Sequence, residues 1–136
     1  MIPIYPGLQP IPGSLFDNQD MLSHPLCQII TPVGNMGYGF DEGVTAHELA
    51  HLVPTGIPTA IVLDSGSTDS GPEKLALGNM TCPRAAYVND LTKLLRLVHT
   101  FRVPLIFSSA GGDGSDDHVK EIGEILEEIT ATQGNE

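Results

Sequence analysis

Glycine and hydroxyl-bearing residues gather in three short segments of the sequence, which read GNMGYG at 34–39, DSGSTDSG at 64–71 and SSAGGDGS at 108–115. Glycine lets the backbone approach a ligand closely, and a following helix adds a partial positive charge. We therefore interpret the segments as ligand-binding loops, although glycines that only form tight turns would give the same pattern. The candidate ligand-binding residues of these loops are Gly34, Gly37, Gly39, Gly66, Ser67, Thr68, Gly71, Ser109, Gly111 and Gly112.

Two carboxylates, Asp64 and Asp69, flank the serine- and threonine-rich turn of the second segment. Carboxylates placed this way can exchange protons with a substrate or hold a divalent cation through oxygen ligands. The alternative is that each caps its own turn, because aspartate readily bonds to nearby backbone amides. Asp64 and Asp69 are the candidate catalytic residues.

Further charged residues stand where helices are predicted to begin. Arg84 starts one helix, where the cation and the helix dipole could hold a carboxylate or phosphate, or where it could form a surface ion pair. Asp113, Asp116, Asp117 and His118 could bind a metal, but the helix dipole already explains acids in a first turn. We add His118 to the candidate ligand-binding residues, although an exposed histidine is the commoner case.

The segment from His47 to His51 reads HELAH and matches the HExxH pattern of zinc peptidases letter for letter. Helical phase argues against that function. The inward stripe of this helix is predicted to be Ala46, Leu49, Ala50 and Val53. His47, Glu48 and His51 would then face solvent. No metal site is predicted, and a zinc site at these three residues stays the alternative.

The elements that must position these loops follow one order. Buried strands are predicted at 26–33, 57–64 and 103–110, and helices at 41–53 with Asp41 as its cap, from 83 to 101 and after Ser115. Val119, Ile122, Leu126 and Ile129 would face inward on the last helix. Strand, loop and helix recurring three times predict βαβ units and an α/β fold, a Rossmann-like three-layer parallel sheet. Three strands are few for that fold, so we expect an incomplete or half domain.

Composition and net charge indicate how many domains the chain forms and which kinds of partner it binds. The chain has 136 residues with 40% hydrophobic residues, which suits one domain at 26–136 after a proline-rich arm at 1–25. A net charge of −11 disfavours nucleic acid and anionic membranes, so we expect a small-molecule ligand and a cytoplasmic protein. Cys27 and Cys82 are expected to be reduced packing residues. A second copy or another chain could cover the open sheet edge.

Nucleotide cofactors have weak support. The first loop reads GxxGxG where dinucleotide-binding loops read GxGxxG, and the sequence contains no GxxxxGK[ST] phosphate loop. The cofactor is therefore left open.

The sequence resembles the amino-terminal domain of the acyclic terpene utilisation (AtuA) family in four segments, which match in order and spacing. The segments are TPVGNMGYGF, AIVLDSGSTDSGP, PRAAYVNDL and PLIFSSAGGDGSDDH. The resemblance covers about residues 26 to 130. The matching motif positions are Asp64, Gly66, Ser67, Thr68, Asp69, Gly71, Pro72, Arg84, Ser109, Ala110, Gly111, Gly112, Asp116 and His118. HELAH is not part of the family pattern, and family members are several times longer, so the resemblance implies a fragment.

The resemblance implies a cytoplasmic protein of carbon catabolism, associated with the breakdown of citronellol- and geraniol-type terpenes. We expect an enzyme or enzyme fragment that acts on a small carboxylate or acyl-thioester of branched-chain breakdown. In this hypothesis Asp64 or Asp69 handles protons or a metal, and Arg84 steadies an anion. The alternatives are a non-catalytic subunit or binding module and the zinc peptidase.

Overall fold

The computed structural model describes residues 25–66 and 69–133, so nearly all of the predicted arm lies outside the described residues. Its sheet has three parallel strands, β1 (Gln28–Ile30), β2 (Thr59–Asp64) and β3 (Leu105–Ser108), in the order β1-β2-β3. Three long helices alternate with them: α1 (Glu42–Leu52), α3 (Arg84–Phe101) and α4 (Asp116–Gln133). The predicted α/β fold with βαβ units is confirmed.

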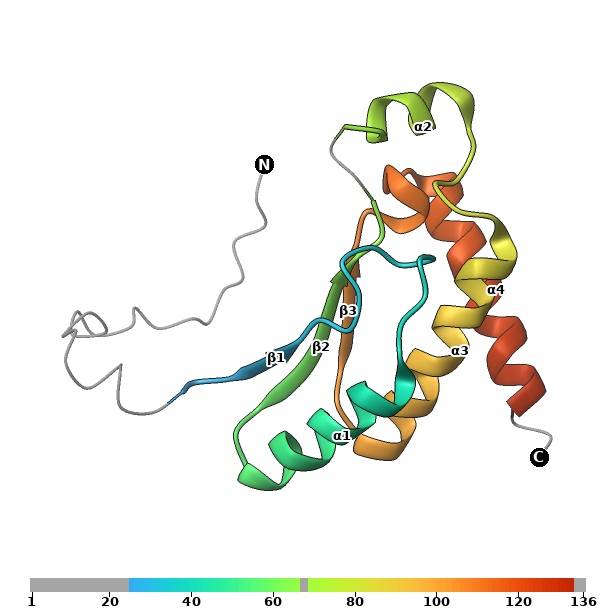
Figure 1. Cartoon of the computed structure of the whole chain (residues 1–136). Coiled ribbons are helices and arrows are strands. Elements are labelled where there is room, and N and C mark those ends of the chain that lie inside the picture. Colours follow the sequence, from blue (N-terminus) through green and yellow to red (C-terminus); the bar gives the residue numbers. More distant parts are fainter. Residues whose placement is uncertain (1–24, 67–68, 134–136) are drawn as a thin grey trace, which may run out of the picture.

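The three long helices lie side by side on one face of the sheet, with α1 against α3 and α3 against α4 (Figure 1). Ile61 and Leu63 of β2 point to this face and are buried. On the opposite face, Ile29 and Ile106 are 61% and 56% exposed. The described residues therefore form two layers, one of helices and one sheet, where a complete domain would have three. This agrees with the prediction of an incomplete or half domain.

The order of the strands explains the missing layer. Each crossover moves one position in the same direction along the sheet, and right-handed crossovers of that kind leave their helices on one face. In a doubly wound domain the second layer of helices comes with strands added on the other side of the first strand. The described residues add no strand there.

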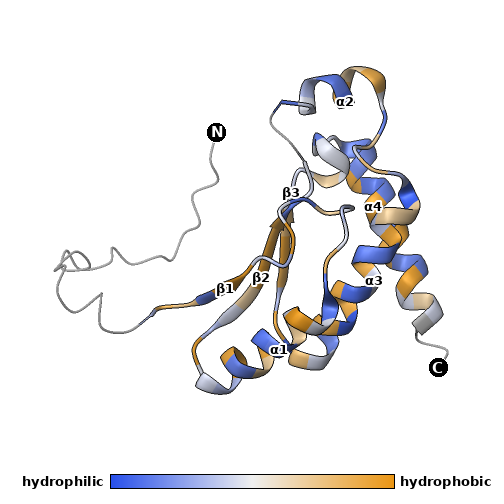
Figure 2. Cartoon of the chain, in the orientation of Figure 1, coloured by the Kyte–Doolittle hydropathy of each residue, from blue (hydrophilic) through white to orange (hydrophobic). Residues whose placement is uncertain are grey.

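The core lies between the sheet and the α3 helix, whose inward side chains include Tyr87, Leu91, Leu94 and Leu97. Colouring by hydropathy shows apolar strands facing helices with mixed surfaces (Figure 2). On α4 the buried residues are Ile122, Ile125 and Ile129. Two predicted inward residues are exposed, Ala50 on α1 and Val119 on α4, because each helix faces the core with a narrower stripe than predicted.

The ends of the elements have local causes. The Asp41 carboxylate accepts a hydrogen bond from the Val44 amide at 3.0 Å and caps α1, as predicted. Pro58 and Pro104, which have no amide hydrogen, stand just before β2 and β3, and both strands begin two residues later than predicted. The strand β1 spans only three residues, and the exposure of Ile29 shows that it is not a buried strand.

Three further short helices complete the described fold. The 3₁₀ helices η1 (Val53–Thr55) and η2 (Ala110–Gly112) follow α1 and β3. Helix α2 (Gly71–Leu77), which was not predicted, lies beyond the carboxyl end of the sheet and has no buried residue (Figure 1). Among the described residues no helix combines the length and the apolar character needed to cross a membrane.

The two cysteines lie in different environments, and both are free. Cys82 is a buried core residue, as predicted. Burial, together with the negative charge of Asp90, raises the pKa of its thiol. Cys27 is exposed, so its predicted packing role is wrong.

Candidate functional site

The three glycine-rich loops meet at the carboxyl edge of the sheet, as the sequence predicts. The amide of Met36 in the first loop donates to the carbonyl oxygen of Asp64 at 2.9 Å. The amide of Ser65 in the second loop donates to the carbonyl oxygen of Ser108 at 3.1 Å. The second loop therefore contacts both of the others.

Glycines allow the second and third loops to pack without side chains between them. A Cβ atom on Gly66 would lie 2.7 Å from the Cβ of Ser109 and 2.9 Å from the carbonyl carbon of Gly112. A Cβ on Gly111 would lie 2.7 Å from the Cβ and Cγ of His118. Real Cβ atoms do not come this close to other atoms, so these positions require glycine.

A pocket of about 330 Å³ opens between these two loops and α2. Its described lining consists of Asp64, Gly71, Pro72, Leu75, Ser109, Gly112 and Asp113. Four of the predicted site residues, Asp64, Gly71, Ser109 and Gly112, thus line one hollow. The described lining contains two carboxylates and no Lys, Arg or His side chain.

Asp64 ends β2 and organises the turn that follows it. Its Oδ1 accepts hydrogen bonds from the amides of Ser65 at 2.7 Å and Gly66 at 3.1 Å, and from the Ser108 hydroxyl at 3.0 Å. Burial alone would raise the pKa of Asp64, but the hydrogen bonds from Gly66, Ser108, Ser65 and Ser109 outweigh it and lower the pKa. Asp64 is therefore ionised near neutral pH and serves as an acceptor.

Asp113 and His118 form a buried pair beside the pocket. Oδ1 of Asp113 lies 2.7 Å from Nδ1 of His118, and both side chains are only 4% exposed. The expectation of an exposed histidine is wrong, because His118 packs under Gly111. Burial opposes ionisation of Asp113, but hydrogen bonds from Ser115 and His118 lower its pKa. Its second oxygen, Oδ2, is buried and has no hydrogen-bond partner.

The first loop uses its amides within the fold. Gly37 and Gly39 donate to Oδ2 of Asp90 at 2.8 and 3.0 Å. Asp90 lies on α3 and is fully buried. Gly34, Gly37 and Gly39 do not line the pocket, so turn formation accounts for Gly37 and Gly39. Asp90 was not predicted, although its inward phase between Tyr87 and Leu91 is visible in the sequence.

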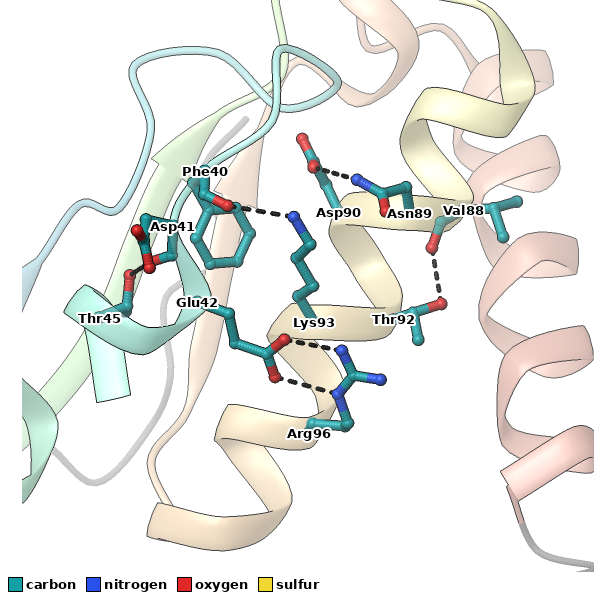
Figure 3. A network of polar contacts seen from close by, with 10 residues as sticks. All are labelled: Phe40, Asp41, Glu42, Thr45, Val88, Asn89, Asp90, Thr92, Lys93 and Arg96. Carbon is teal, nitrogen blue, oxygen red and sulfur yellow. Dashed lines mark hydrogen bonds and ion pairs between the residues drawn. The ribbon is translucent and has the colours of Figure 1, made fainter. Parts of the chain in front are cut away.

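Contacts from α3 also hold the start of α1 (Figure 3). The Lys93 ammonium donates to the carbonyl oxygen of Phe40 at 3.1 Å and lies 5.3 Å from the centre of its ring. Arg96 forms two hydrogen bonds to Glu42, at 3.0 and 2.7 Å, and these lower the pKa of Glu42. These contacts fix the chain directly after the first loop.

The structure places Arg84 outside the pocket lining. Its guanidinium forms an exposed ion pair with Glu128 of α4 at 2.7 Å, and this hydrogen bond raises the Arg84 pKa. Arg84 therefore forms a surface ion pair, one of its two predicted roles, while anion binding by Arg84 stays a prediction. Asp69 is exposed and does not line the pocket, while Ser67 and Thr68 lie outside the described residues.

The HELAH segment lies on the outer surface of α1. His47, Glu48 and His51 are exposed, and Leu49 is buried, as the helical phase predicts. The carbonyl oxygen of His47 lies 2.7 Å from Nδ1 of His51, so this nitrogen has a partner within the helix. In the described part of the chain, no group of three or more His, Cys, Asp or Glu side chains is arranged to hold a metal ion.

Comparisons of the chain with family models, with curated proteins and with solved structures found no match.

Proposed function

We propose that the chain is a small-molecule-binding α/β domain of the acyclic terpene utilisation type. In this proposal it acts in the cytoplasm, in branched-chain carbon breakdown, as an enzyme or as part of one. The observation that carries the proposal is the contact of Gly66 with Ser109 and Gly112. It joins the two loops with the most specific motifs, DSGSTDSGP and SSAGGDGSDDH, around one pocket at the edge where α/β sheets bind ligands.

Electrostatics favour an acyl-thioester over a free carboxylate. Asp64 and Asp113 both have lowered pKa values, and the described lining offers no cation to balance a further negative charge. A carboxylate ligand would be repelled, whereas an uncharged acyl group would pack against Pro72 and Leu75. The ligand in this proposal is therefore the acyl part of a thioester.

A thermal-shift comparison of short branched acyl-thioesters with the matching free acids tests this proposal. Leu75 and Leu77 offer a matched pair of variants, because both are exposed on α2 and only Leu75 lines the pocket. The thioesters should raise the melting temperature of the wild type and of Leu77→Ser, and raise that of Leu75→Ser less. If no thioester stabilises the wild type, the proposed function is wrong.

The uncovered face of the sheet favours a second candidate, a non-catalytic subunit. Parallel sheets are almost always covered on both faces, and here Ile29 and Ile106 are exposed. In this candidate a second copy of the chain packs on that face. Light scattering should then show a dimer that Ile106→Ser weakens, with Val119→Ser on α4 as the exposed control. A wild type that is monomeric at high concentration would exclude this candidate.

A further inference from the structure

Ser109 has an unusual backbone conformation for its residue type. Its φ is +53° and its ψ is +41°, in the left-handed region that favours glycine. It stands between the end of β3 and the start of η2, and the nearby Gly111, Gly112 and Gly114 also have positive φ. A glycine at 109 would adopt this turn without strain, so the turn itself does not require a serine side chain.

The surroundings of Ser109 accommodate its side chain. Gly66 leaves the space beside the Ser109 Cβ, because any side chain on Gly66 would occupy it. Ser109 also lines the pocket together with Asp64 and Asp113. Both the strained backbone and the missing neighbour side chain therefore serve to keep one hydroxyl at this wall of the pocket.

We propose that Ser109 is a ligand-contacting residue that accepts a hydrogen bond from the ligand, and that the pocket selects acyl groups bearing a hydroxyl. This inference rests on the proposed function and adds the substrate class. The hydrogen bond from Ser109 to the Asp64 carboxylate uses the hydroxyl proton and leaves the lone pairs of the Ser109 oxygen as acceptors. Asp113, whose side chain is only 4% exposed, lines the same pocket, and Ser109 is the acceptor on which the inference rests.

The residues that line the pocket suit a ligand that donates a hydrogen bond. Asp64 and Ser109 offer acceptors, while Pro72 and Leu75 offer an apolar wall. A ligand hydroxyl that replaces water at Ser109 keeps this acceptor hydrogen-bonded, whereas an unsubstituted acyl chain leaves it without a partner. The hydroxyacyl-thioester should bind about tenfold more tightly than the unsubstituted thioester of the same length.

The experiment measures the dissociation constants of one hydroxyacyl-thioester and its unsubstituted counterpart by calorimetry. The proteins are the wild type, Ser109→Ala and Ser109→Gly. Ser109→Ala should lose the preference for the hydroxyl and bind both compounds alike. Ser109→Gly should lose it too, and its melting temperature should rise by about 4 °C because the strain is relieved.

Arg102 provides the control for strain relief. It is the other described non-glycine residue with positive φ, +56°, and lies at the end of α3, outside the pocket lining. Arg102→Gly should raise the melting temperature and keep the ligand preference. An unchanged preference in Ser109→Ala would overturn the inference and leave the proposed function intact, whereas no binding of either compound to the wild type would overturn both.

Discussion

The carboxylate of Asp90 in the middle of α3 accepts a hydrogen bond from the amide of Gly37 at 2.8 Å, across 53 positions of sequence. The amide of Gly39 donates to the same oxygen at 3.0 Å. A loop whose glycines suggested contacts with a ligand is therefore held by a buried side chain of its own fold. The candidate ligand-binding residues are therefore those of the second and third loops.

Removing this carboxylate should destabilise the protein. In Asp90→Ala two amides lose a charged acceptor in a part-buried position, and the free energy of unfolding should fall by about 3 kcal/mol. Urea denaturation measures the change. Asp117→Ala, at an exposed position of α4, is the control and should change it by less than about 1 kcal/mol. An equal effect of the two substitutions would contradict the role of Asp90.

The close approach of the second and third loops predicts opposite effects for two glycine substitutions. Gly66→Ala places a methyl group against Ser109 and Gly112, and should lower the free energy of unfolding by about 2 kcal/mol. Gly123→Ala lies within α4, where the new Cβ would have nothing within 4 Å beyond the adjacent backbone of its own helix, and should raise the free energy of unfolding by about 0.5 kcal/mol. Urea denaturation of both variants checks the prediction, and a neutral Gly66→Ala would disprove the contact.

The Asp113–His118 pair predicts that the stability of the protein depends on pH in the acidic range. Because the pKa of Asp113 in the folded state is below its ordinary value of about 3.9, the ionised form stabilises the fold above that pH. This contribution is lost as the pH falls through the folded-state pKa. The difference in unfolding free energy between wild type and Asp113→Asn should shrink as the pH falls from about 5 toward 2. A difference independent of pH would refute this.

The exposed HELAH segment predicts no dependence on zinc. His47→Ala removes an exposed imidazole and leaves the Leu49 contact with the core, so the melting temperature should change by less than about 2 °C. Elemental analysis should find the same zinc content in the wild type and the variant. If the wild type instead contains stoichiometric metal that His47→Ala lacks, the result would support the zinc-peptidase alternative.

Local patterns in the sequence predicted most elements. The apolar run before Asp64 predicts β2, Asp41 predicts the start of α1, and the spacing of Leu91, Leu94 and Val98 predicts α3. Helix α2 escaped prediction because it buries no side chain and so has no apolar stripe. The uncovered sheet face also escaped, since it depends on the order of the strands, which composition and periodicity do not determine.

The site was harder to predict because its contacts join distant segments. Asp64 and Ser109 could be chosen as candidates from their loops alone, and both line the pocket. The partner of Arg84 stands 44 positions away on α4, and no local pattern indicates that ion pair. Burial of His118 likewise depends on the fold of the loop before it, where Gly111 covers the ring.

The two thiols lie in different environments, so their reactivity can report on motion within the protein. A maleimide dye applied at neutral pH should label Cys27 beside β1 and spare Cys82, whose sulfur lies under the Gly37 turn and whose pKa is raised. Slow labelling of Cys82 would then record the rate at which that turn lifts away from α3. Opening of the first loop, which borders the other two at the carboxyl edge of the sheet, can thus be timed in the native chain without an introduced probe.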